Sequence, residues 1–139
     1  LALCEGIFKE DTGRIETYIG RSPSDRVKMA VVPKEKGKYA LTEYEVQARY
    51  AEGFTLARFR PYTGRTHQIR VHCRHIGHPV VGDPVYGSKK QKFHLAGQLL
   101  HACRLELTHP RTGERMSFEA PLPAYFIDVL SRLERGGRV

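Results

Sequence analysis

A chain of 139 residues is long enough for one domain with its own core, and 40% hydrophobic with 27% charged residues excludes a disordered chain. A formal net charge of +8 favours a polyanionic partner such as RNA over a generally basic protein without one. No apolar run approaches the roughly 18 residues of a membrane helix, and three cysteines without a CxxC spacing fit free thiols in a reducing cytoplasm.

The N-terminal third of the chain predicts short strands joined by loops. Leu1–Cys4 is apolar and typical of the end of a strand, and Arg14–Ile19 predicts a second strand. Thr12-Gly13, between them, predicts a turn. The loop that follows the second strand is basic, because it contains Arg21, Arg26 and Lys28.

A hairpin is predicted in the middle of the chain, where apolar and polar residues begin to alternate. The apolar positions are Tyr44, Val46, Ala48 and Tyr50, which predicts a half-buried strand with these four side chains on one face. Residues 51–53 predict the connection, and Phe54–Arg60 predicts the strand that returns.

A helix over residues 67–76 follows, with Thr66 as the expected N-cap and Gly77 as the residue that ends it. Its packed face is expected to carry Ile69, Cys73 and Ile76. Another flank carries Arg70 and Arg74 four residues apart, so the two cations repel each other unless an anion or a carboxylate lies between them.

The C-terminal part predicts a turn-rich segment over 82–87, a solvated loop over 88–95, and two strands over 99–107 and 115–120 joined by a hairpin. Residues 121–135 predict a helix with an apolar stripe formed by Phe126, Val129, Leu130 and Leu133. The sequence therefore predicts the α+β class, with a mixed, mainly antiparallel sheet and flanking helices.

Two long ungapped runs carry a more specific pattern. They read Gly64-Arg65-Thr66-His67-Gln68-Ile69-Arg70-Val71-His72 and Gly77-His78-Pro79-Val80-Val81-Gly82-Asp83-Pro84-Val85-Tyr86-Gly87. Together they resemble the third motif of the RluA-type pseudouridine synthases, which isomerise uridine in ribosomal or transfer RNA. Flanking pieces agree in order, among them Ile19-Gly20-Arg21, Leu99-Leu100-His101-Ala102 and Ala120-Pro121-Leu122-Pro123.

The resemblance implies an RNA isomerase that flips its target base into a cleft, uses an aspartate nucleophile and needs no cofactor. In that family the aspartate lies in an upstream His-Arg-Leu-Asp motif, which these 139 residues do not contain, and the base-stacking tyrosine is missing as well. We therefore expect residues 1–139 to be the C-terminal portion of the catalytic domain. The N-terminal portion would be its partner, and the fragment alone would be inactive.

Matched to the family motif, Arg70 is expected to pair with the nucleophilic aspartate and Leu100 to line the base pocket, unless Leu100 is a plain core residue. Arg65, His67 and Gln68 at the helix start are candidates for RNA contact, although hydrogen bonds that hold the fold are an equal alternative for His67 and Gln68. The remaining candidates for RNA contact are basic: Arg21, Arg26, Lys28 and Arg74. The residues Gly82, Asp83, Pro84 and Tyr86 are interpreted as structural turn chemistry, with contact to the substrate as the alternative.

Two alternatives remain from the residues themselves. A non-catalytic RNA-binding module would use the basic surface without chemistry. A zinc-binding domain would use His72, Cys73, His75 and His78, although no CxxC or HExxH accompanies them and no metal is expected.

Overall fold

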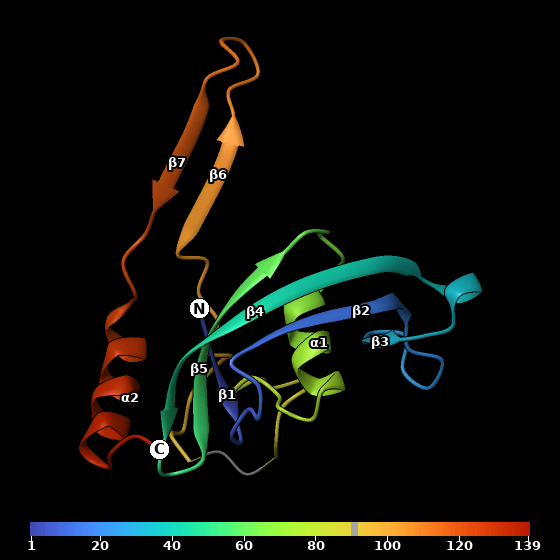
Figure 1. Cartoon of the computed structure of the whole chain (residues 1–139). Helices are drawn as coiled ribbons and strands as arrows, with labels where there is room; N and C mark the ends of the chain where they lie inside the picture. Colours follow the sequence, from blue (N-terminus) through green and yellow to red (C-terminus); the bar gives the residue numbers. More distant parts are fainter. Residues whose placement is uncertain (90–91) are drawn as a thin grey trace.

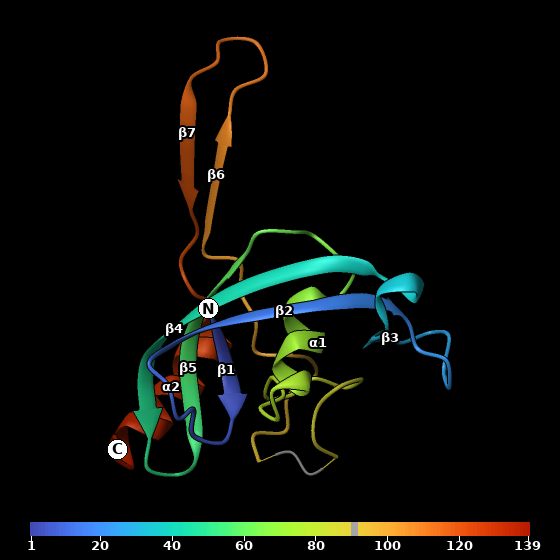
Figure 2. The same cartoon turned by 45° about the vertical axis from the view of Figure 1, so that its right-hand side comes forward.

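The computed structural model describes residues 1–89 and 92–139. Five antiparallel strands form a curled sheet in the order β1-β5-β4-β2-β3, and a separate hairpin, β6–β7, stands away from it (Figure 1 and Figure 2). Within these described residues two α-helices accompany the sheet, and neither has the length or apolar character needed to cross a membrane. The predicted α+β class is confirmed.

The elements follow each other in the order β1 (Ala2–Glu5), β2 (Thr12–Arg21), β3 (Met29–Val31), a 3₁₀ turn η1 (Lys34–Lys36), β4 (Lys38–Tyr50), β5 (Phe54–Pro61), α1 (Gln68–His75), β6 (Arg104–Thr108), β7 (Arg115–Glu119) and α2 (Ala124–Arg135). The predicted loop over 88–95 includes residues 90 and 91, which lie outside the described residues.

The two faces of the sheet carry separate cores. Successive residues of a strand point to opposite faces, so Ala2 and Cys4 of β1 join a cluster with Cys73 of α1, whereas Leu3 joins a cluster with Phe126 of α2. The predicted apolar stripe of α2 is confirmed by the burial of Phe126, Val129 and Leu133. The helices α1 and α2 thus cover opposite faces of the sheet.

The β4–β5 hairpin corrects one prediction. Its connection is as expected, with the Gly53 N–H donating to the Tyr50 carbonyl. The pairing register shifts between Val46 and Ala48, however, which leaves Gln47 as an extra residue in β4. The expected single face is wrong for this reason: Val46 packs on the α1 side, and Ala48 and Tyr50 pack on the α2 side.

Two further local predictions are wrong because tertiary neighbours decide them. Thr12-Gly13 is not a turn but the start of β2, and a side chain at Gly13 would collide with the ring of Tyr44, its partner on β4. The predicted strand over 99–107 begins only at Arg104. The residues before it pair with β1 instead, through the bridge between Ala2 and Leu100.

The core that α2 forms gives a prediction for stability. The Phe126 side chain is fully buried, whereas its neighbour Ile127 is 47% exposed. We expect Phe126→Ala to lower the free energy of unfolding by about 3–5 kcal/mol, because a large cavity opens between α2 and the sheet. The matched control is Ile127→Ala, and urea unfolding measures the free energy of unfolding of both variants. Equal losses in the two variants would contradict the packing described.

Candidate active site

Helix α1 is held at its start by one buried side chain, that of Gln68. Its Oε1 accepts hydrogen bonds from the Thr63 hydroxyl (2.7 Å) and the Arg65 backbone N–H (3.0 Å). Its Nε2 donates to the Leu41 carbonyl and the Thr42 hydroxyl, both at 2.9 Å. Two of these bonds hold the helix start on β4 and two hold the loop before it. All four favour the fold-holding role for Gln68 over contact with RNA.

The N-cap differs from the prediction. His67, and not Thr66, occupies this position, with a left-handed backbone (φ 55°) and no capping bond from its side chain. The side chain instead turns to the loop after α1, where Nδ1 lies 2.9 Å from the Tyr86 hydroxyl. The same hydroxyl accepts a hydrogen bond from the Met29 backbone N–H at 2.9 Å, so Tyr86 joins the helix start to β3.

The centre of the site is a pair between Arg70 and Asp83. Arg70 Nε donates to Oδ2 and Nη2 donates to Oδ1, both at 2.8 Å, with side-chain exposures of 11% for Arg70 and 0% for Asp83. The guanidinium also lies 5.2 Å from the centre of the Tyr86 ring. The Asp83 carboxylate and the Tyr86 ring together fix the position of the guanidinium.

Asp83 is ionised in this setting. Its burial acts to raise the pKa of the carboxyl, but hydrogen bonds from Arg70 and from the backbone N–H groups of Tyr86 and Val85 outweigh burial and leave the pKa below its usual value. The same pair raises the pKa of Arg70. Two of the five guanidinium N–H groups point to Asp83, which leaves three for another acceptor.

Asp83 and Tyr86 are the site residues that the sequence did not reveal, since the loop reads as ordinary turn chemistry. One signal was available. Arg70 and Arg74 lie four residues apart on a helix, and this spacing calls for a carboxylate nearby. The structure meets that need for Arg70 alone: among residues 1–89 and 92–139, Arg74 forms no ion pair.

A second buried polar group lies on the inner face of α1. His72 is fully buried, with Nδ1 2.8 Å from the Thr42 hydroxyl and Nε2 2.7 Å from the Thr17 hydroxyl. Because Thr42 already accepts from Gln68, every group is satisfied when the Thr42 hydroxyl donates to Nδ1 and the His72 Nε2–H donates to Thr17. Burial, helped by the charge of His75, lowers the pKa of His72 to about 4.

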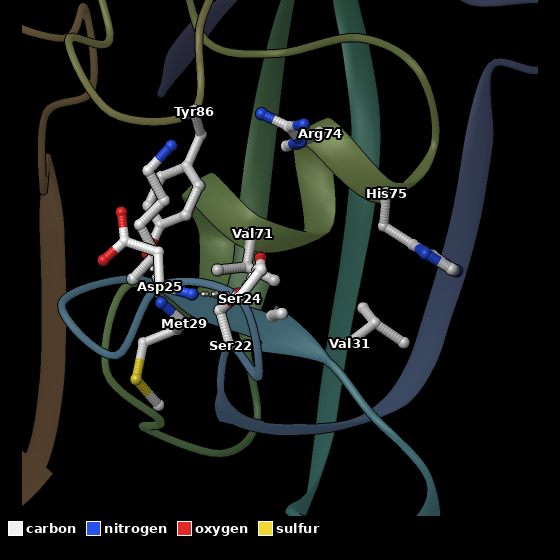
Figure 3. A pocket seen from close by; sticks show the side chains of 11 residues that line it. Ser22, Ser24, Asp25, Met29, Val31, Val71, Arg74, His75 and Tyr86 are labelled. Atoms are coloured by element: carbon white, nitrogen blue, oxygen red, sulfur yellow. Dashed lines mark hydrogen bonds between the residues drawn. The ribbon is translucent and has the colours of Figure 1, made fainter.

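The other candidate residues take different places. Leu100 packs, partly buried, against the cluster that contains Cys4 and Val80. Arg65 Nε donates to the Tyr39 carbonyl, and Arg21 Nη1 donates to the carbonyl of the exposed Arg26. Lys28 and Arg74 both line a hollow between the loop after β2 and α1. Figure 3 shows this hollow with Arg74 on the helix. Arg21 and Arg65 line a neighbouring hollow of about 480 Å³.

The four residues of the zinc alternative do not come together. His72 contacts two threonines, and the Cys73 sulfur lies 3.8 Å from that of Cys4. His78 Nδ1 instead lies 2.9 Å from the Glu5 carbonyl oxygen. No group of three or more potential ligands that would hold a metal is found in the part of the chain that the structure describes. The arrangement gives this alternative no support.

Comparison with known proteins places the chain in a family. The model of the RNA pseudouridylate synthase family matches residues 1–75, and the chain belongs to this family. Its relatives confirm the resemblance to the RluA-type enzymes. An uncharacterized RNA pseudouridine synthase of Chloroflexus aurantiacus is 49% identical over 89% of this chain and 38% of its own length.

A second relative is the ribosomal large subunit pseudouridine synthase D of Neisseria meningitidis serogroup A, which is 48% identical over 97% of this chain and 38% of its own length. The solved structure of human RNA pseudouridylate synthase domain containing 1 matches 96% of this chain and 63% of its own length, with a TM-score of 0.75 and 29% identity. The chain thus spans about two fifths of the length of these two curated relatives.

The histidine on α1 gives a prediction with a definite sign. The pKa of His72 is about 4 in the folded protein and about 6.5 in an unfolded chain. Between these values only the unfolded chain takes up the proton, so this group removes about 3 kcal/mol of stability as the pH falls from 6.5 to 4. The gap in unfolding free energy between wild type and His72→Gln should shrink by that amount over this range.

The control is Ile127→Ala, which changes no titratable group, so its gap to wild type should not depend on pH. Chemical denaturation at a series of pH values measures both gaps, and NMR of the ring protons follows the titration itself. A His72 ring that titrates near 6.5 in the folded protein would contradict the buried, neutral assignment.

Proposed function

We propose that the protein that contains this chain converts uridine to pseudouridine in RNA, with Arg70 as the partner of an aspartate nucleophile supplied from outside residues 1–139. The family match and the names of the relatives support this proposal, and the ribosomal large subunit enzymes among them favour ribosomal RNA over transfer RNA as the target. The single observation that carries the role of Arg70 is its buried, bidentate pair with Asp83.

The reaction explains what such an arginine contributes. Isomerisation breaks the bond between C1′ and N1 of uracil, rotates the base and joins C1′ to C5, after which the proton on C5 is exchanged for one on N1. The nucleophilic carboxylate has to stay ionised while RNA excludes water from the site. A neighbouring guanidinium opposes the rise in pKa that burial causes. Arg70 can do this because three of its N–H groups remain available.

Asp83 itself is poorly suited to be the nucleophile. Its side chain is fully buried, and its two oxygens already accept four hydrogen bonds, two from Arg70 and two from the backbone of its own loop. A carboxylate held in this way cannot reach a ribose carbon. We propose that Asp83 positions Arg70. The nucleophile would come from the N-terminal portion of the catalytic domain.

The projecting hairpin supports this division of the domain. Leu105 and Phe118 are paired across β6 and β7, with 58% and 49% of their surface exposed. Such a pair of large apolar side chains suits an inner face of a larger domain. We propose that the preceding portion packs on it, and that the isolated chain, without its nucleophile, is inactive. No cofactor is needed in this scheme.

The complete enzyme gives the test. The Arg70→Lys substitution keeps a positive charge beside Asp83 but loses the fork of N–H donors, so kcat for pseudouridine formation should fall by about 10²–10³ with a smaller change in KM. Lys9→Gln, at an exposed lysine without an ion pair among the described residues, serves as the control and should keep full activity.

Two outcomes would count against the proposal. One is wild-type kcat in the Arg70→Lys enzyme, which would remove the catalytic role of the arginine. The other is that residues 1–139, joined to the aspartate-bearing portion, bind RNA but form no pseudouridine. That second outcome would favour the non-catalytic RNA-binding module.

A further inference from the structure

A hollow of about 300 Å³ lies beside the Arg70 pair, between the loop after β2, strand β3 and helix α1 (Figure 3). We propose that it binds an unpaired nucleotide next to the target uridine, with the phosphate on Lys28 and Arg74 and the base against Met29 and Val71. This inference rests on the proposed function, since it names a second contact of the same RNA. The volume is at the lower end of the range for pockets that hold small ligands.

The charges around the hollow suit a phosphate. Lys28 enters from the loop and Arg74 from the helix, and neither forms an ion pair or a side-chain hydrogen bond within residues 1–89 and 92–139. The contrast with Arg70 is direct. Asp83 neutralises Arg70, whereas Arg74, one turn later on the same flank, keeps its charge unbalanced. These two cations outnumber the one carboxylate in the lining, that of Asp25, so the hollow attracts an anion.

The lining suits a base. Val71 is buried, and Met29 and Val31 from β3 add apolar surface, against which the face of an unpaired base can pack. Polar groups stand at the rim, including Ser24 and the carboxylate of Asp25. An ionised carboxylate only accepts hydrogen bonds, so it favours bases with an exocyclic amino group, which are adenine, cytosine and guanine, over uracil.

Tyr86 connects this hollow to the Arg70 pair. Its side chain lines the hollow, its ring lies under the Arg70 guanidinium at 5.2 Å, and its hydroxyl accepts from the Met29 N–H at 2.9 Å. One side chain therefore separates the two places. This closeness is why we assign the hollow to a nucleotide that flanks the target uridine and not to a distant part of the RNA.

The test uses the complete enzyme and a short single-stranded RNA with one photoreactive 4-thiouridine, placed in turn at each position around the target. Arg74→Gln and Lys28→Gln should each weaken binding and reduce the slope of log K against log salt by about 0.7, because one phosphate contact is lost. Both residues lie at the surface, so the variants should fold. Lys9→Gln, which removes a charge that does not line the hollow, should leave the slope unchanged.

Two further readouts address the base. In wild type, one flanking 4-thiouridine should crosslink to the peptides that contain Met29 or Val71. Replacing a flanking adenine, cytosine or guanine by uracil should raise KM in wild type. Asp25→Asn should reduce this difference in KM between the two RNAs, because an amide can both donate to and accept from a base.

The outcomes separate the two proposals. Pseudouridine formation with unchanged salt slopes in Arg74→Gln and Lys28→Gln would overturn the nucleotide site and leave the proposed function standing. Crosslinks to Met29 or Val71 without any pseudouridine would keep the nucleotide site and overturn the proposed isomerase. Displacement of the RNA by polyglutamate, with no crosslink in the hollow, would assign it to an acidic protein segment and would also overturn this inference.

Discussion

The bidentate pair between Arg70 and Asp83 is the interaction on which the candidate site depends. Both side chains are withdrawn from water, so neither charge can be removed alone without leaving the other unpaired, at a cost of about 3–5 kcal/mol. The pair ties α1 to the loop behind it, and Tyr86 extends the tie to β3. A cation is thereby held at a fixed point with several donors still free, as stabilisation of a carboxylate requires.

A second set of contacts fixes the inner face of the same helix. The hydrogen bonds of Gln68 and His72 reach two strands of the sheet, β2 through Thr17 and β4 through Leu41 and Thr42. Hydrogen bonds depend on direction, whereas apolar contacts do not. Cys73 packs against Cys4 of β1, and its pKa is raised by the sulfur contact and by burial, so this thiol stays protonated. These contacts on its inner face oppose rotation and sliding of the helix, so its outer residues keep fixed positions at the surface.

The sequence predicted the features that depend on local periodicity and missed those that depend on distant partners. The hairpin connection over 51–53 and the apolar stripe of α2 follow from spacing alone, and the structure confirms both. The bulge at Gln47 leaves the alternation of apolar residues unchanged, so no local pattern reveals it. Arg70 was a candidate from the motif, but its partner Asp83 looked like a turn residue. Asp83 accepts hydrogen bonds from the backbone of its own loop, and a turn aspartate has this sequence pattern whether or not an arginine pairs with it.

The most direct test of this account is a double-substitution cycle on the single-turnover rate of pseudouridine formation by the complete enzyme. If Asp83 acts through Arg70, Asp83→Asn alone slows the reaction. In an enzyme that already carries Arg70→Lys, the further substitution Asp83→Asn should lower the rate by less than about threefold, because the guanidinium that Asp83 positions is already gone. Multiplicative effects of the two substitutions, or a wild-type rate in a folded Asp83→Asn enzyme, would contradict the claim that this pair prepares the arginine for catalysis.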